Sequence, residues 1–117
     1  EIQSAFSNLI MNAIFYSALD TEIQILWQRV GDEAELKVID QGPGIEEQHI
    51  ARLTERFYRV DPSRSTATGG TGLGLAIVKH VLLRHKAILD IKSQIGVGSI
   101  FTCRFPAERI MILSQTV

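Results

Sequence analysis

Two asparagines near the start of the chain have the residue type and the spacing to hold a metal ion and a phosphate. Asn8 and Asn12 are four residues apart, so on a helix they project from one face, and Tyr16 continues that face one turn later. A carboxamide oxygen can bind a hard cation such as Mg²⁺, which takes few protein ligands beside water and phosphate oxygens. For the pair alone, a solvated helix side is the simpler interpretation.

A second candidate is a carboxylate at the end of a strand-like run. In Asp40-Gln41-Gly42-Pro43-Gly44, the Asp is followed by two glycines that would let a flat ring approach the backbone. A buried Asp at such a place can accept a hydrogen bond from an exocyclic amine such as that of adenine. Taken alone, the segment could equally be a tight turn.

A glycine-rich segment, Gly69-Gly70-Thr71-Gly72-Leu73-Gly74-Leu75, leads directly into a helical pattern. Backbone N–H groups at a helix N-terminus are suited to binding phosphate. No Gly-Lys-Ser/Thr is present and no hydrophobic strand precedes the glycines, which excludes the P-loop and the dinucleotide-binding fingerprint. A flexible linker is the alternative, but the apolar Leu73, Leu75 and Ile77 argue against it.

Arginines lie in and beside the stretch before these glycines, near Phe57 and Tyr58. Guanidinium groups pair well with phosphate oxygens, so these side chains could contact a polyphosphate. A solvated basic loop is the simpler interpretation of the arginines alone. They are Arg52, Arg56, Arg59 and Arg64.

The elements that must position these residues show both helical and strand-like periodicity. An apolar stripe through Ile2, Ala5, Phe6, Leu9 and Ala13 predicts a first helix that ends near residues 17–20. Strands are then expected at 23–30 and 35–40 around a turn at 31–33, a short helix at 46–53, a loop at 54–72, a helix at 73–84, and strands at 88–93 and 99–105 around a turn at 96–98.

The buried stripe of the later helix is expected to run through Leu73, Ile77, Val81 and Arg84, with Gly74 packed close. No strand–helix–strand unit of the parallel kind is evident. The pattern therefore predicts an α+β fold, a two-layer sandwich with a mixed, mostly antiparallel sheet covered on one face by helices.

Composition limits the classes of protein that fit. The 117 residues, 45% of them hydrophobic, suffice for one domain, and the net charge of −1 gives no case for generic binding to nucleic acid or membrane surfaces. Cys103 is the only cysteine, so neither an internal disulfide nor a cysteine metal cluster can form. The sequence begins without methionine and opens on a helical pattern, as expected of an excised piece.

Five short motifs, in this order, resemble the ATP-binding domain of bacterial sensor histidine kinases. Asn8-Leu9-Ile10-Met11-Asn12-Ala13 is similar to their N box, and Asp40-x-Gly42-x-Gly44 to their G1 box. Phe57-Tyr58-Arg59 is similar to the F box, Gly70-Thr71-Gly72-Leu73-Gly74-Leu75 to the G2 box, and Gly96-x-Gly98-Ser99-x-Phe101 to the closing hairpin. The resemblance spans residues 1–106 as one catalytic domain, with 107–117 as a tail whose order is left open. It is closest to the sensor kinases of the phosphate regulon.

The resemblance implies a Bergerat α/β sandwich with a Mg²⁺–ATP site under a mobile lid. Asn12 would be the Mg²⁺ ligand, and Asn8, its phosphate-side neighbour, would share catalysis with Arg59. Asp40 would bind the adenine amine, supported by the hydroxyl of Ser99, which stands where the family usually has Thr. The other nucleotide contacts would be Tyr16, Gly42, Gly44, Tyr58, Arg59, Arg64, Gly70, Thr71, Gly72, Leu73 and Gly74.

Two positions bear on the chemistry. The family often has Lys where this chain has Phe15, so the positive charge must come from Arg59 or Arg64, or phosphate affinity is lower. ATP-hydrolysing relatives of this sandwich place a Glu one turn before the metal-binding Asn, whereas here Asn8 cannot act as a general base. Phosphoryl transfer to an outside nucleophile is therefore favoured over hydrolysis.

The expected nucleophile is a histidine on the parent protein's own dimerisation domain, and the expected downstream partner is a response regulator. In the family's pattern an acidic residue follows the acceptor, which is not true of His49, His80 or His85. The domain is expected on the cytoplasmic side of a protein anchored in the bacterial inner membrane. Two alternatives stay open: a non-catalytic ATP-dependent regulatory module, and a Bergerat-fold serine kinase of the anti-sigma type.

Overall fold

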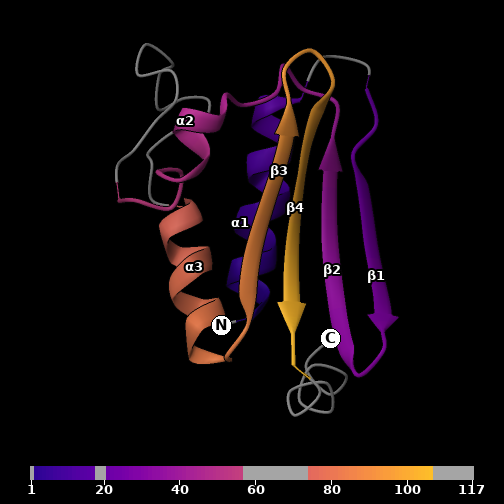
Figure 1. The fold of residues 1–117 in the computed structure, drawn as a ribbon, viewed down its shortest axis with the longest axis vertical. Coiled ribbons are helices and arrows are strands. Elements are labelled where there is room, and N and C mark those ends of the chain that lie inside the picture. The colour runs from indigo at the N-terminus through magenta and orange to yellow at the C-terminus, as the bar shows by residue number, and fades with distance from the viewer. Residues whose placement is uncertain (1, 18–20, 57–73, 107–117) are drawn as a thin grey trace.

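The computed structural model describes residues 2–17, 21–56 and 74–106 (Figure 1). Along the chain the elements are α1 (Ile2–Tyr16), β1 (Gln24–Val30), β2 (Glu33–Asp40), α2 (Glu47–Ile50), α3 (Gly74–Arg84), β3 (Ile88–Gln94) and β4 (Gly98–Phe105). The strands form one sheet in the order β1-β2-β4-β3, and each neighbouring pair is antiparallel. Helices α1 and α3 pack against each other and contact the sheet through β2 and β3. The predicted α+β sandwich is confirmed.

The first hairpin is tighter than the sequence pattern predicted. Val30 pairs with Glu33, so the turn contains only Gly31 and Asp32, and β2 begins two residues before the predicted start. Gly31 has a φ of 61°, the left-handed conformation that two-residue hairpins favour. The second hairpin differs in the same way, because Gly98 pairs with Gln94 and already belongs to β4.

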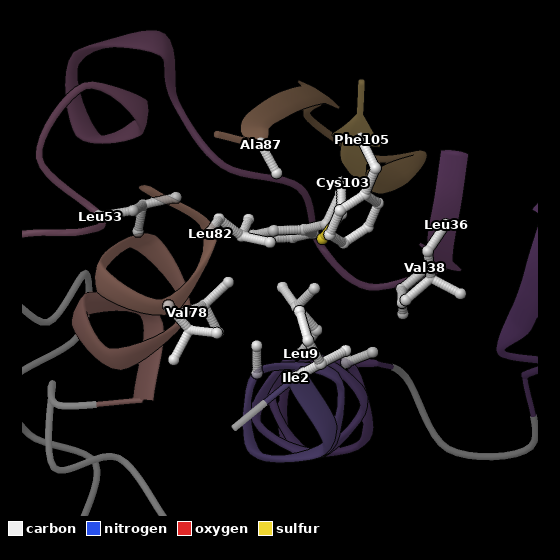
Figure 2. Packing of buried hydrophobic residues seen from close by; sticks show 14 residues of the cluster. Ile2, Leu9, Leu36, Val38, Leu53, Val78, Leu82, Ala87, Cys103 and Phe105 are labelled. Atoms are coloured by element: carbon white, nitrogen blue, oxygen red, sulfur yellow. The ribbon is translucent and has the colours of Figure 1, made fainter. Parts of the chain in front are cut away.

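The core lies between the sheet and the two longer helices. The predicted stripe of α1 is confirmed, since Ile2, Ala5, Leu9 and Ala13 are all 3% exposed or less. Figure 2 shows Leu9 and the α3 side chains Val78 and Leu82 directed toward Phe105 and Cys103 of β4. Burial of each large apolar side chain is worth about 1.5–3 kcal/mol, so this layer holds the helices against the sheet.

The predicted stripe of α3 is confirmed at Val81 but was wrong at Ile77 and Arg84, which are exposed, and Leu73 lies outside the described residues. Its buried residues are Val78, Val81 and Leu82, whereas Ile77 is 41% exposed. Val78, Val81 and Leu82 are at positions i, i+3 and i+4 and therefore share one face of the helix. Helix α3 packs against both α1 and β3. The sequence periodicity allowed either neighbouring face, and packing against two elements selected this one.

Helix α2 ends at Ile50, earlier than the predicted residue 53. Beyond it the backbone continues in tight turns, with Arg52 N–H donating to His49 O (3.0 Å) and Leu53 N–H to Ile50 O (3.3 Å). These bonds span three residues instead of four, which is typical of a frayed helix end. Leu53 is nonetheless buried and anchors the segment to the core. Most of the predicted 54–72 loop lies outside the described residues.

Candidate functional site

The candidate site residues of the sheet lie where β2 ends and β4 begins. In Figure 1 the β3–β4 turn lies at this same end of the sheet, and so does the C-terminal end of α1. Asp40, the last residue of β2, is paired in register with Ser99 of β4. The site therefore combines a strand end, a hairpin and a helix end.

Asp40 is a buried carboxylate, with 5% of its surface exposed. Its Oδ1 accepts a hydrogen bond from Gly42 N–H at 2.9 Å. Burial raises the pKa of Asp40, while the N–H groups of Gly42 and Ser99 act in the opposite direction. A buried acceptor held by a backbone donor at the end of a strand can receive a further donor from a ligand.

The loop that follows Asp40 lies directly on the β3–β4 hairpin. Gly44 has a φ of 83°, and a Cβ there would collide with Gln94 O and lie 2.8 Å from Ile95 Cα. Gly96 N–H donates to Pro43 O at 2.9 Å and ties the two segments together. Gly44 is thus required both for its conformation and for the close backbone contact.

A serine that sequence reasoning missed lies under this loop. The Ser93 hydroxyl of β3 is 2.7 Å from Ile45 N, 3.0 Å from Gly98 O and 2.8 Å from Ser99 Oγ. Ser99 itself is 4% exposed, so its hydroxyl is directed into the molecule. The only available sequence signal was that Leu89 and Ile91 predict an apolar residue at position 93, where Ser stands instead.

The two asparagines of α1 lie beside the buried stripe, as predicted, and both are half-buried. Asn8 Nδ2 donates to Ser4 O at 2.8 Å, and Asn8 Oδ1 would be 3.1 Å from a Cβ on Gly74. The absence of a side chain at Gly74 therefore lets the start of α3 approach Asn8 closely. Asn12 follows one turn later on the same face.

Several predicted contacts lie outside the described residues: Tyr58, Arg59, Arg64, Gly70, Thr71, Gly72, Leu73 and the side chain of Tyr16. Arg52 is described, and it forms an exposed ion pair with Glu55 at 3.0 Å. Surface pairs of this kind contribute little to stability. The structure brings together Asp40, Gly42, Gly44 and Ser99 at the sheet end, and Asn8 with Gly74 between the helices.

Comparisons with known proteins show which family the chain belongs to. Residues 1–109 match the family model described as histidine kinase-, DNA gyrase B- and HSP90-like ATPase. The chain belongs to this ATPase family. It is 58% identical over 109 residues to the phosphate regulon sensor protein PhoR of Pseudomonas aeruginosa, covering 92% of this chain and 25% of that protein. It is 48% identical over 103 residues to the sensor-like histidine kinase SenX3 of Mycolicibacterium smegmatis, covering 88% of this chain and 27% of that protein.

Among solved structures, the mycobacterial sensor histidine kinase MprB matches with a TM-score of 0.76 at 32% identity, covering 88% of this chain and 68% of that one. The Acinetobacter baumannii histidine kinase AdeS matches with a TM-score of 0.71 at 31% identity, covering 91% of this chain and 45% of that one. The chain spans about a quarter of the length of the curated relatives. Family membership establishes a nucleotide-binding ATPase domain of the histidine kinase type.

Within residues 2–17, 21–56 and 74–106 there is no group of three or more His, Cys, Asp and Glu that could hold a metal ion. Carboxamide oxygens on α1 could complete the coordination of a cation that arrives with phosphate. In the same residues no helix is long and apolar enough to span a membrane.

Proposed function

We propose that this chain binds Mg²⁺–ATP and donates its γ-phosphate to a histidine on a separate dimerisation domain of its parent kinase. The observation that carries the proposal is the buried Asp40 carboxylate beside the Gly42–Gly44 turn. An adenine amine would donate to this carboxylate, and the glycines would let the ring lie against the backbone. Ser99 would support the same end of the site.

The phosphate end would be served by α1. When bound, Mg²⁺ would offset the charge of the phosphates, and Asn12 would hold it through a neutral oxygen. Asn8 has no basic group, and its carboxamide nitrogen already donates to Ser4 O. A residue of this kind can orient a phosphate but cannot activate water, which favours transfer over hydrolysis.

The biological setting of the proposal comes from the relatives. The similarity to PhoR of Pseudomonas aeruginosa supports a place in phosphate sensing, with a response regulator as the downstream partner. It also supports a parent protein anchored in the membrane. Residues 1–106 would form the catalytic domain, and the 107–117 tail lies outside the described residues.

The binding half of the proposal is tested by calorimetric titration of Mg²⁺–ATP into wild type, Asn12→Ala and Asp40→Asn. Gln3→Ala, an exposed change on the same helix, serves as the matched control. We expect binding by wild type and the control, with affinity at least about tenfold weaker in each site variant because each loses an interaction with the ligand. Unchanged affinity in both site variants would contradict the assigned contacts.

The transfer half is tested with labelled ATP and a separately supplied histidine-bearing dimerisation domain. We expect label on the supplied domain and none on this chain, whose histidines lack the following acidic residue. Label on a serine of a partner protein would favour the anti-sigma type of kinase instead. Binding without any transfer would favour a regulatory module, an alternative supported by the half-buried Phe15 in place of a lysine.

A further inference from the structure

Ser93 is a polar residue in an apolar row. On the inner face of β3 it follows Leu89 and Ile91, which pack against the core. An apolar side chain at position 93 would continue this packing without any need for a hydrogen-bond partner. Ser93 instead places a hydroxyl at the last inner position before the hairpin. The three hydrogen bonds of this hydroxyl explain why a polar residue is suited to the position.

The three contacts of Ser93 form one consistent hydrogen-bond arrangement. A hydroxyl donates one proton and can accept two. Ile45 N–H donates to Ser93 Oγ at 2.7 Å, the Ser99 hydroxyl donates to it at 2.8 Å, and Ser93 donates to Gly98 O at 3.0 Å. This assignment satisfies every group involved and uses the full capacity of the Ser93 hydroxyl.

These bonds lead to Asp40 by two routes. The first runs through Ser99, whose hydroxyl is hydrogen-bonded to Ser93 and whose backbone is paired in register with Asp40. The second runs through Ile45, which ends the loop that begins at Asp40. Ser93 thus holds the loop at its far end while it orients the residue that pairs with Asp40 at its near end.

We propose that Ser93 is a positioning residue for adenine recognition, fixing Asp40 and the Gly42–Gly44 turn in the geometry that receives the ring. This inference rests on the proposed assignment of Asp40 to the adenine amine. Ser93 need not touch the nucleotide itself. Its loss would free Ile45 N–H and the Ser99 hydroxyl to find other partners, and the carboxylate would lose its orientation.

The test compares binding of Mg²⁺–ATP and Mg²⁺–ITP, because inosine has a carbonyl where adenine has the exocyclic amine. Calorimetry is run on wild type, Ser93→Ala, Ser93→Thr, Asp40→Asn and the exposed control Ser7→Ala. We expect Ser93→Ala to weaken ATP binding about fivefold, the size of one lost hydrogen bond, with ITP binding unchanged. Ser93→Thr, which keeps the hydroxyl, and Ser7→Ala should both retain the wild-type preference for ATP.

The outcomes separate this inference from the proposed function. If wild type prefers ATP, and Asp40→Asn but not Ser93→Ala loses the preference, the role of Ser93 is overturned while the adenine site stands. A Ser93→Ala protein that unfolds more easily but keeps the ATP-to-ITP ratio would likewise overturn it, since a purely structural serine would behave so. Wild type that binds both nucleotides equally would overturn the adenine assignment itself.

Discussion

Two glycines with the same φ angle provide a controlled test of the loop–hairpin contact. Gly44 and Gly96 both have a φ of 83°, so replacing either by Ala introduces the same left-handed penalty. A Cβ on Gly96 would meet nothing within 4 Å, whereas one on Gly44 would collide with the backbone of Gln94 and Ile95. The difference between the two variants isolates the cost of pushing the loop away from the hairpin.

The magnitude follows from the bonds that must break. A left-handed alanine costs about 1 kcal/mol, which is the whole effect expected for Gly96→Ala. In Gly44→Ala the loop must also move, which would disrupt the bonds Gly96 N–Pro43 O and Ile45 N–Ser93 Oγ. At about 1 kcal/mol for each bond, the total for Gly44→Ala is about 3 kcal/mol.

The assay is urea unfolding of both variants and wild type, followed by far-ultraviolet circular dichroism. We expect a gap of about 2 kcal/mol in the free energy of unfolding between Gly44→Ala and Gly96→Ala, or roughly 10 °C in Tm. Equal destabilisation by the two changes would refute the reasoning, because it would mean that the loop tolerates a side chain at the contact. Unequal values of m would indicate that a variant also alters the unfolded state.

Three other predictions rest on burial. Leu9 is 1% exposed, so Leu9→Ala should lower the free energy of unfolding by about 3 kcal/mol. Met11 is 45% exposed, so Met11→Ala should lower it by less than about 1 kcal/mol. Urea titration of both variants and wild type measures the difference. Burial raises the pKa of the Cys103 thiol to about 12, so a thiol reagent should modify the folded protein far more slowly than the urea-unfolded one, and equal rates would contradict this burial. Because the pKa of Asp40 is raised above 3.8, the folded state binds its proton more tightly than the unfolded state. The stability of wild type relative to Asp40→Asn should therefore be greatest below pH 3.8 and fall as the pH rises through the raised pKa, a trend that unfolding curves across this range would reveal or refute.

The α1 helix and the strands were predictable because their signals are local. The stripe of α1 follows from residues three and four apart, and the positions of Asn8 and Asn12 beside it follow from the same geometry. The order of strands and helices could be read in the same way. Strand ends were less predictable, since Glu33 and Gly98 join their strands only through pairing with Val30 and Gln94.

The face of α3 was not predictable from periodicity alone. Its apolar residues include Ile77 as well as Val78, so two adjacent faces have comparable apolar content. The choice depends on α1 and β3, which contact α3 from positions far away in the chain. Close approach of Gly74 to Asn8 adds to that choice, because a larger residue would hold the two helices apart.

The sequence by itself determined the chemical groups of the site: carboxamides one turn apart, a carboxylate before two glycines, and a glycine-rich segment that leads into a helix. These are properties of residue type and short spacing, and they suffice to indicate the family. The support beneath the site was decided by tertiary structure, because Ile45 and Ser93 are 48 residues apart and meet only when the sheet forms. Hydrogen bonds between such distant groups leave no periodic trace in the sequence, so the interruption of the apolar row at Ser93 gave no indication of which groups it contacts.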